Sequence, residues 1–538
     1  MIHAPRRLYS LLPSSKGNSL FQGKSILAKK PKIDVHPDYP VRTRFAPSPT
    51  GFLHMGSLRT ALYNYLLARN TGGQFLLRLE DTDQKRLVEG AEENIYESLK
   101  WCGIQYDEGP GVNDIKNGQY RQSDRTNIYR KYIDKLLDEG HAYRCFCTKD
   151  RLDGLRASAQ QLQPPTTTSY DRYCYHLSNT EIKEKIDAKI PFTVRMKAPD
   201  VYPAFKDLLH GELNVQQQFN HNDRRYDDPI LMKSDNLPTY HFANVIDDYL
   251  MKITHVIRGE EWLPSTPKHI ALYSAFGWSP PHFIHIPLLT SLTDKKLSKR
   301  KGDSSVLKFK EKGVLPEALV NFSVLFGWSP PRELSSKNHE CFTMLEFEKL
   351  FNLNYLTKGN AKVDEKKLWF FNKHYLQEYL RNPENLERAT NKILPVVQER
   401  FSKSIASYET VSTILQSCGS ALASLMEFNN TFSYFFEEPN FNNTEYIEKF
   451  LKNRNIDDVL SILNGVKGNI EGKDIEEMVT TLVSELNVSK KDVFRSLRFA
   501  LAASHPGAKI PVLIDIIGSQ ETNNRIQRAI QYLKATLP

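Results

Sequence analysis

The segment Val41–Asp83 constrains the fold more than any other part of this 538-residue chain. Val41–Phe45 reads as a strand, and it enters Ala46-Pro47-Ser48-Pro49-Thr50-Gly51, where the prolines force a turn and forbid a helix. Apolar residues then recur at helical spacing from Leu58 to Leu66, and they alternate as in a strand from Phe75 to Leu79. Strand, turn, helix and strand within about 45 residues form a βαβ unit, which predicts an α/β fold with a parallel sheet.

The rest of the chain extends this pattern. Helical spacing continues at Ala91–Cys102 and Asn127–Glu139, and strand signals return at Ile253–Ile257 and Ile284–Leu289. From about residue 340 onward the pattern is mostly helical. The length predicts roughly three to four domains. No apolar run approaches the roughly 20 residues that a membrane helix needs, so we expect no membrane insertion.

The positive charge is concentrated at the start of the chain. Residues 1–33 contain seven Lys or Arg and several serines but no Asp or Glu, which is the composition of a mitochondrial transit peptide. The alternative is an unstructured basic tail that contacts nucleic acid. Without these seven charges, the formal net charge of +9 falls to +2. Any RNA site on the remaining chain must therefore be a local basic patch.

Two short segments carry chemistry. His54 and Gly56 lie where the proline-rich turn delivers the chain to a helix N-terminus, whose backbone N–H groups favour phosphate. Gly56 has no side chain, so an adenine ring can lie flat against the backbone. His54 can donate a hydrogen bond to a phosphate oxygen. Alone this motif is weak, because a single histidine is more often structural.

The second segment is Lys295–Gly302, which places five cations within seven residues. Such a run is usually a solvated, charged surface. The functional alternative is a mobile loop whose lysines neutralise a triphosphate at the transition state. Together the two segments resemble the paired nucleotide-binding signatures of class I aminoacyl-tRNA synthetases, here His-Met-Gly-Ser and Lys-Leu-Ser-Lys-Arg. The pair is far more specific than either half.

The surrounding sequence narrows the family. Arg-Phe-Ala-Pro-Ser-Pro-Thr-Gly, Leu-Arg-Leu-Glu-Asp-Thr-Asp and Val-Ile-Arg-Gly-Glu-Glu-Trp are similar to segments of bacterial-type glutamyl-tRNA synthetases, and the similarity covers nearly all the chain after residue 40. Glutaminyl enzymes share the fold but usually carry Glu-Pro-Asn-Gly in the turn. The resemblance implies glutamate as the amino-acid substrate.

The site that this resemblance implies also has a physical basis. Glutamate carries two carboxylates and one ammonium, so its site needs cationic forks and an anion. Arg44 and Arg258 lie near the carboxyl ends of predicted strands, where open α/β sheets bind ligands, and Glu80 can receive the ammonium. The implied glutamate-binding positions are Arg44, Ala46, Ser48, Glu80, Tyr240, Asn244 and Arg258. The implied ATP-binding positions are His54, Gly56, Glu261 and Lys299, with catalytic roles for His54, Lys296 and Lys299.

The reaction that the resemblance implies has two steps. The glutamate carboxylate attacks the α-phosphate of ATP, which enters with Mg²⁺, and a hydroxyl of the terminal adenosine of tRNA(Glu) then attacks the activated carbonyl. Positioning and charge stabilisation supply most of the catalysis. In many family members the first step needs bound tRNA, and the resemblance suggests the same here. Family members are by default monomers.

A third signal is Cys145-Phe-Cys147, followed 26 residues later by Cys174-Tyr-His176. Three thiols and one imidazole suit tetrahedral Zn²⁺. The spacing also resembles a zinc site that some bacterial glutamyl enzymes carry in their acceptor-binding insertion. The alternative is three buried free cysteines and a structural histidine. With six cysteines in the whole chain, a disulfide framework is not expected.

The expected architecture is a Rossmann-type core interrupted by an insertion. Residues 38–123 and 238–306 would form the catalytic domain, and 124–237 an α+β insertion that grips the acceptor end of tRNA. Residues 307–375 would contact the tRNA stem, and the all-helical 376–538 would read the anticodon. Glutaminyl enzymes use β-barrels there, so a helical C-terminal part favours glutamate.

Three other functions remain open on sequence alone. A glutamyl transferase acting on a modified tRNA base would lack the long C-terminal part, and so would a small-molecule nucleotidyltransferase with a similar H-x-G motif. A non-catalytic tRNA-binding protein should have lost His54, Lys299 or the two arginines, all of which are present. The sequence does not decide whether tRNA(Gln) is charged as well.

Overall fold

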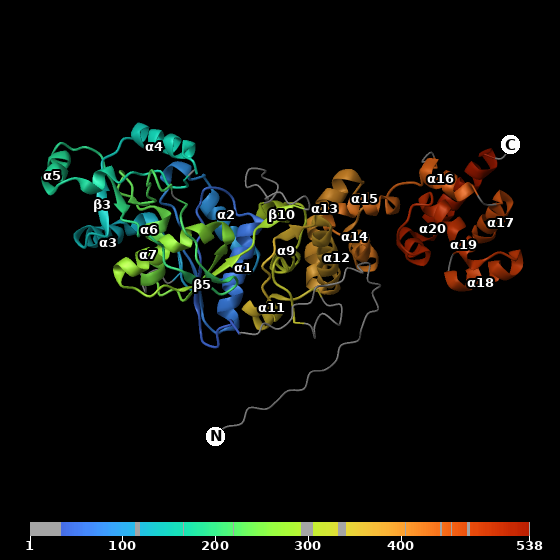
Figure 1. The fold of residues 1–538 in the computed structure, drawn as a ribbon. Helices are drawn as coiled ribbons and strands as arrows, with labels where there is room; N and C mark the ends of the chain where they lie inside the picture. The colour runs from blue at the N-terminus through green and yellow to red at the C-terminus, as the bar shows by residue number, and fades with distance from the viewer. Residues whose placement is uncertain are drawn as a thin grey trace, which may run out of the picture.

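The computed structural model describes residues 34–112, 119–164, 166–218, 220–291, 305–331, 340–403, 405–441, 444–452, 455–470 and 474–536. Its N-terminal half mixes helices and strands, and its C-terminal helices extend away from that half (Figure 1). The predicted transit segment, residues 1–33, lies outside the described residues, as do Lys296 and Lys299.

The predicted βαβ unit forms the start of the core. Strand β1 (Arg42–Phe45) leads through the proline-rich turn into helix α1 (Met55–Asn70) and then into β2 (Gln74–Leu77). The two strands are parallel, with Arg42 opposite Gln74 and Phe45 opposite Leu77. Helix α1 is buried along most of its surface, which places it inside the molecule rather than on its surface.

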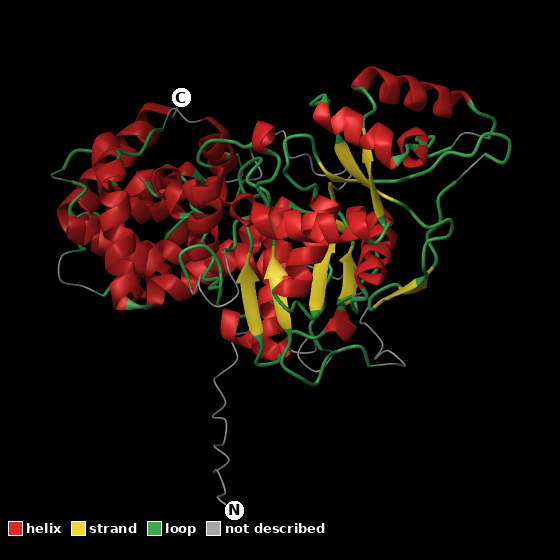
Figure 2. Cartoon of the chain, turned by 90° about the vertical axis from the view of Figure 1, so that its left-hand side faces the viewer, coloured by secondary structure: helices red, strands yellow, loops and turns green. Residues whose placement is uncertain are grey.

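The sheet continues through strands that are distant in sequence. Strand β8 (His255–Gly259) pairs in parallel with β9 (His282–Ile286), and β9 pairs in parallel with β5 (Phe205–Asp207). The N–H of Thr254 donates to the carbonyl of Arg42 over 2.9 Å, which joins β8 to β1. These strands run side by side and are flanked by helices (Figure 2). The predicted parallel α/β core is confirmed.

The strand boundaries differ from the sequence prediction for identifiable reasons. The N–H of Ile253 donates to the carbonyl of Asp248 in the turn that ends α6 (Tyr240–Leu250), so β8 begins two residues later than predicted. The predicted strand over 284–289 is split, because Pro287 has no N–H to donate to a ladder. Strand β9 ends at Ile286, and the short β10 (Leu289–Ser291) follows.

Helices pack on this sheet, and one short strand extends it. The predicted helices at 91–102 and 127–139 are α2 (Ala91–Trp101) and α3 (Thr126–Asp138), which differ by a single residue at each shifted end. Helix α7 (Thr266–Phe276) follows β8. The short strand β6 (Gly211–Leu213) pairs antiparallel with β5 at the edge of the sheet.

Between β2 and β8 the chain forms a separate small sheet of antiparallel strands in the order β3–β4–β7. Its strands are β3 (Ala142–Cys145), β4 (Thr193–Met196) and β7 (Ile230–Met232), and its helices are α4 (Lys149–Gln161) and α5 (Asn179–Asp187). Figure 2 shows this part standing apart from the main sheet. These strands and helices all lie within residues 124–237, the range predicted for the α+β insertion, whereas β5 and β6 from the same range pair into the main sheet.

After the core come α8 (Val306–Glu311), α9 (Pro316–Val324), α11 (Met344–Leu350) and β11 (Ala361–Val363), which pairs in parallel with β10. The chain then continues as helices α12 (Glu365–Arg381), α13 (Pro383–Arg400), α14 (Tyr408–Cys418), α15 (Phe428–Thr431), α16 (Thr444–Leu451), α17 (Ile456–Val466), α18 (Ile475–Leu486), α19 (Lys490–Ala502) and α20 (Ile510–Thr536). Their own hydrophobic core extends from Leu376 to Leu533.

Short 3₁₀ turns connect these elements at Gln84–Arg86, Gln122–Arg125, Tyr173–His176, Glu260–Ser265, Leu353–Tyr355, Gly419–Ala421, Leu425–Glu427 and Ser433–Phe435. Beyond β11, the described residues contain no strand, so the predicted helical C-terminal region is confirmed. None of the helices in the described part of the chain combines the length and apolar character needed to cross a membrane.

Candidate active site and cysteine group

His54 is the N-cap of α1. Its Nδ1 accepts hydrogen bonds from the N–H groups of Gly56 and Ser57 at 3.1 and 3.3 Å, and its Nε2 lies 3.1 Å from the hydroxyl of Ser57. The sequence predicts free N–H groups here for a phosphate. In the structure the imidazole itself occupies two of them, because its Nδ1 lies over the first turn of the helix.

Gly56 makes this arrangement possible. A Cβ at this position would lie 3.1 Å from Cε1 of His54 and 3.9 Å from the side chain of Leu289 in β10. The glycine is therefore needed for the close approach of the His54 ring, independently of any adenine.

The described residues that flank the cationic segment lie beside the first signature. Ser305, the first described residue after that segment, forms an antiparallel bridge with His54, and the N–H of Val306 donates to the carbonyl of Leu53. Leu289, which precedes the segment, lies against Gly56. Residues 292–304, which include Lys296 and Lys299, are outside the described residues.

A buried group of charges lies at the carboxyl ends of β1 and β2. Arg44 donates through Nε to Asp248 at 3.0 Å. Arg78 donates to Asp248 at 2.7 Å and to Glu80 at 3.1 Å. Burial alone would raise the pKa of Asp248, but Arg44 and Arg78 together hold that pKa below its usual value. Burial raises the pKa of Glu80, and the same two arginines oppose the shift without cancelling it.

Asn244 of α6 completes this group. With its amide oriented to satisfy both polar atoms, its oxygen accepts from Arg78 at 3.2 Å and its nitrogen donates to Asp248 at 3.3 Å. The sequence motifs give no role to Arg78, Asp247 or Asp248. A signal was present, because Arg78 stands between Leu77 and Leu79 in the predicted strand from Phe75 to Leu79, whose other residues are apolar. The charge in that pattern indicates a buried partner.

The proline-rich turn lies directly over Glu80. The N–H of Glu80 donates to the carbonyl of Pro47 over 3.0 Å, and the N–H of Thr50 donates to that of Ser48 over 2.8 Å. Ala46 is half-buried and Ser48 is exposed at this edge. The structure therefore brings Ala46 and Ser48 close to Glu80. The predicted glutamate-binding site needs these three residues to lie together.

Arg258 near the end of β8 has a different environment. Its guanidinium donates to Thr266 at 2.8 Å, to His285 at 3.0 Å, and to the hydroxyl of Tyr240 and to His269 at 3.2 Å each. The side chain is 4% exposed. None of these partners is a carboxylate.

Glu261 lies one turn further along, on the 3₁₀ segment after β8. Its carboxylate packs against Gly259, where a Cβ would come within 2.0 Å of Oε2. The side chain of Glu261 is exposed, so it faces the solvent side of the sheet edge where Arg258 is buried.

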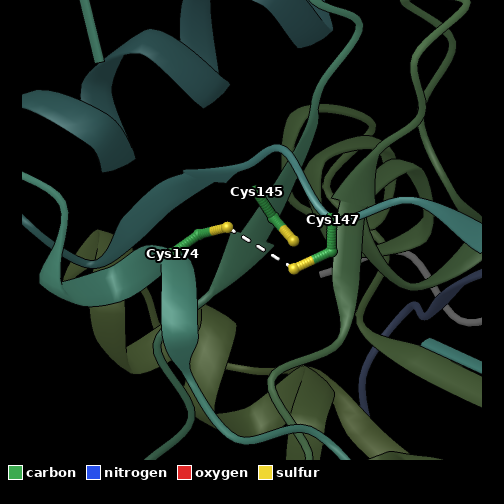
Figure 3. A group of neighbouring side chains, drawn as sticks. All are labelled: Cys145, Cys147 and Cys174. Carbon is green, nitrogen blue, oxygen red and sulfur yellow. Dashed lines mark hydrogen bonds between the residues drawn. The ribbon is translucent and has the colours of Figure 1, made fainter. Parts of the chain in front are cut away.

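The three cysteines of the insertion lie together (Figure 3). The sulfurs of Cys145, Cys147 and Cys174 are all within 4.8 Å of one another, and those of Cys147 and Cys174 are 3.5 Å apart. Hydrogen bonds from Cys147 and Cys174 hold the pKa of the Cys145 thiol far below its usual value, against the effect of burial. A thiolate in a cysteine group is the donor that Zn²⁺ prefers.

His176, the predicted fourth ligand, is not in this group. Cys174 and His176 lie on one 3₁₀ turn, where residues two apart point in different directions. Cys174 is consequently buried, whereas the His176 ring is exposed. The hydroxyl of Tyr170 lies beside the sulfurs instead, 3.3 Å from Cys145 and 3.7 Å from Cys147.

Comparisons with known proteins agree with this geometry. Residues 40–370 match the family described as "tRNA synthetases class I (E and Q), catalytic domain", and residues 374–530 match the "Anticodon binding domain". The chain accordingly has the catalytic and anticodon-binding domains of a class I aminoacyl-tRNA synthetase.

Individual relatives show which class I aminoacyl-tRNA synthetases the chain is similar to. The chain is 58% identical to the mitochondrial glutamate–tRNA ligase of Saccharomyces cerevisiae over 99% of each chain. It is 41% identical to the glutamate–tRNA ligase of Clostridioides difficile, over 90% of this chain and 98% of that one. The crystal structure of the glutamate-tRNA synthetase from Elizabethkingia anophelis matches with a TM-score of 0.78 and 34% identity, over 91% of this chain and 99% of that one. The chain belongs to the glutamate–tRNA ligases.

Proposed function

We propose that this chain activates glutamate with ATP and transfers the glutamyl group to the 3′ end of tRNA(Glu). The observation that carries the choice of amino acid is Arg258, a buried guanidinium whose described partners are all neutral. A buried cation without a counter-charge is unfavourable in the empty site, and it is relieved when a carboxylate binds. Glutamate supplies that carboxylate.

The ammonium and the second carboxylate of glutamate fit the charged side chains at the ends of β1 and β2. Glu80 is buried beside Arg78 and lies under the turn that contains Ala46 and Ser48. Its carboxylate receives the substrate ammonium. Arg44 stands next to it and holds a substrate carboxylate, while Tyr240 and Asn244 supply neutral hydrogen bonds. These groups are on rigid strand ends and on α6, so they orient the substrate before ATP reacts.

ATP, entering as its Mg²⁺ complex, binds beside the N-terminus of α1. His54 donates from Nε2 to a phosphate oxygen as negative charge moves during attack. This fits the hydrogen bonds of the ring, because Nδ1 accepts from Gly56 and Ser57, so the proton of the neutral imidazole is on Nε2. Gly56 and Glu261 border the nucleotide, and Lys296 and Lys299 neutralise its phosphates; Ser305, which follows them in the sequence, forms a bridge with His54.

The remaining parts hold the tRNA. Residues 124–237 bind the acceptor end, 307–375 contact the stem, and 376–538 read the anticodon. The thiolates of Cys145, Cys147 and Cys174 fit Zn²⁺, which would cross-link the insertion, and the Tyr170 oxygen is better placed than His176 to complete the set. The chain acts in the mitochondrial matrix, which the basic, acid-free residues 1–33 and the mitochondrial relative support. We propose that it is a monomer, as family members are by default.

The deciding experiment is aminoacylation of mitochondrial tRNA(Glu) and tRNA(Gln) transcripts with labelled glutamate and, separately, labelled glutamine. We expect glutamate on tRNA(Glu), with kcat/KM for glutamate reduced about 100-fold or more in Arg258→Ala. Charging with glutamine instead would overturn the substrate assignment. Absence of charging with either amino acid would overturn the catalytic proposal.

A further inference from the structure

The buried arginines of the site differ in what neutralises them. Arg44 and Arg78 each donate to the carboxylate of Asp248, and Arg78 also reaches Glu80. Arg258 has no acidic residue among its hydrogen-bond or ion-pair partners in the described part of the chain. Its closest partners are Thr266, His269 and His285, whose side chains are completely buried.

The direction of these hydrogen bonds fixes the protonation of both histidines. Arginine only donates, so Nδ1 of His269 and Nε2 of His285 must be unprotonated acceptors. His285 then carries its proton on Nδ1 and donates it to Asp207 at 2.8 Å. His269 carries its proton on Nε2 and donates it to Nδ1 of His241 at 3.0 Å. Each histidine is therefore held in a single neutral tautomer.

The electrostatics are consistent with two neutral rings. Burial lowers the pKa of His269 well below its usual value, and the nearby positive charge of Arg258 lowers it further. Burial lowers the pKa of His285 to about 4, with Arg258 adding to the shift and Asp207 opposing it. Neither ring carries a charge at neutral pH.

We propose that His269 and His285 determine the choice of glutamate over glutamine by positioning Arg258 through neutral nitrogen lone pairs. A carboxylate in either place would hold the guanidinium equally well, but it would also neutralise it. The histidines orient the guanidinium and leave its charge for the substrate side chain. This inference rests on the proposed binding of glutamate at Arg258.

The consequence is that the charge of the substrate side chain, rather than its shape, sets the preference for glutamate. Glutamate and glutamine side chains have nearly the same volume, so a pocket cannot separate them by size. An uncompensated buried guanidinium gains an ion pair from the carboxylate, whereas a carboxamide leaves the buried charge unpaired. The two histidines act as positioning residues, since they contact Arg258 and not the substrate.

Two isosteric pairs test this without changing the shape of the site. His269→Gln keeps a neutral acceptor, whereas His269→Glu places an anion of the same size against Arg258. Thr266→Asn and Thr266→Asp make the same comparison from the Nη2 side of the guanidinium, where Thr266 now accepts at 2.8 Å. The assay is ATP–pyrophosphate exchange with saturating ATP and tRNA(Glu), with glutamate or glutamine as the amino acid.

We expect the acidic member of each pair to lower the ratio of kcat/KM for glutamate to that for glutamine by about 10- to 100-fold relative to its amide partner. The amide variants should keep a ratio close to that of the unaltered protein. KM for ATP, measured separately with glutamate saturating and ATP varied, should stay constant throughout, since none of the variants alters a capping contact of His54. Thermal melting of every variant identifies those that fold, and either folded pair suffices.

Equal ratios within the folded pairs would overturn the inference, because charge against Arg258 would then not set the choice. So would an equally large loss of selectivity in His269→Gln and Thr266→Asn, which would indicate packing alone. The unaltered protein separates this from the proposed function: if it activates glutamate while the pairs show no difference, only the inference falls. If it does not activate glutamate, the proposed function falls first.

Discussion

At the scale of single residues, His54 has two separable functions. Its Nδ1 caps α1 by accepting from Gly56 and Ser57, which leaves Nε2 as the donor proposed to contact phosphate. Asparagine is among the best N-cap residues, but it lacks a donor at the Nε2 position. A single position can therefore distinguish helix stability from catalysis.

We predict that His54→Ala loses both functions and that His54→Asn loses only one. Removing the cap should cost about 0.5–2 kcal/mol of unfolding free energy in His54→Ala and far less in His54→Asn. Glutamate activation should fall about 100-fold in both, because each lacks the Nε2 donor. Chemical denaturation and ATP–pyrophosphate exchange give the two measurements. Full activity in His54→Asn would show that capping is the only role of the histidine.

The sequence predicts the candidate site residues by motif but not their mutual support. The positions of Arg44, Glu80 and Arg258 at one sheet edge were predictable, because these residues lie at or just beyond the ends of recognisable strands and parallel strands end at a common edge. Asp248 was not, because its contact with Arg78 joins positions 170 residues apart that nothing in the local pattern links. The neutral partners of Arg258 were missed for the same reason. His269 and His285 come from α7 and β9, and only the folded sheet brings them together.

At the scale of elements, local physics explains both successes and failures. Helices α2 and α3 were placed within a residue because their apolar spacing is regular and well bounded. The predicted strand over 284–289 failed at Pro287, which interrupts the ladder between β9 and β10. The C-x-H spacing predicts a fourth ligand that the structure does not place beside the sulfurs. Cys174 is buried in the cysteine group, whereas His176, two residues further along the same 3₁₀ turn, is exposed.

The zinc content of variants in the insertion tests whether this 3₁₀ turn keeps His176 away from the metal. We predict that Cys174→Ser loses bound zinc and lowers the melting temperature, because the remaining thiols no longer form a closed group. His176→Ala should keep its zinc, since the exposed ring lies outside the group. Metal content by mass spectrometry and thermal melting of the purified variants measure both effects.

Tyr170→Phe is the complementary variant, because it removes only the oxygen that lies 3.3 Å from Cys145. It should retain zinc less tightly against a chelator than the unaltered protein does. Loss of zinc in His176→Ala with full retention in Tyr170→Phe would contradict the placement of both side chains and restore the C-x-C, C-x-H set.

At the scale of the whole molecule, the catalytic part and the C-terminal helices meet at a small, tightly packed contact. Asn372 of α12 accepts from the N–H of Leu315 at 2.7 Å, and donates to the carbonyls of Gly313 at 3.2 Å and Ala423 at 2.6 Å. The hydroxyl of Ser424 donates to the carbonyl of Lys312 at 3.2 Å. The buried amide of Asn372 thus joins the α8–α9 connection to the turn after α14.

This contact couples the two ends of the tRNA proposed to bind here. An aminoacyl-tRNA synthetase must hold the anticodon and the acceptor end at once, so the angle between its two parts determines how well the tRNA fits. The active-site residues for ATP and glutamate all lie within the catalytic part. A small change at the contact should therefore affect tRNA without affecting the small substrates.

Gly313→Ala is the change that the geometry indicates. Gly313 has a φ of +81°, and a Cβ there would lie 2.3 Å from the hydroxyl oxygen of Ser424, so the new methyl group must push the two parts away from each other. We predict that KM for tRNA(Glu) rises about tenfold, while KM for ATP and for glutamate, measured at saturating tRNA, stays within experimental error. Steady-state aminoacylation with each substrate varied in turn gives all three values.

Gly359→Ala is the matched control, because a Cβ at Gly359 meets no atom within 4 Å and the residue precedes the same helix α12 through β11. It should leave every KM unchanged. If Gly313→Ala raised KM for ATP and glutamate as much as that for tRNA, the contact would be supporting the fold of the catalytic part. If it changed none of them, the relative placement of the two parts would not limit tRNA binding, and the helical region would recognise the anticodon independently of the site that Arg258 and His54 define.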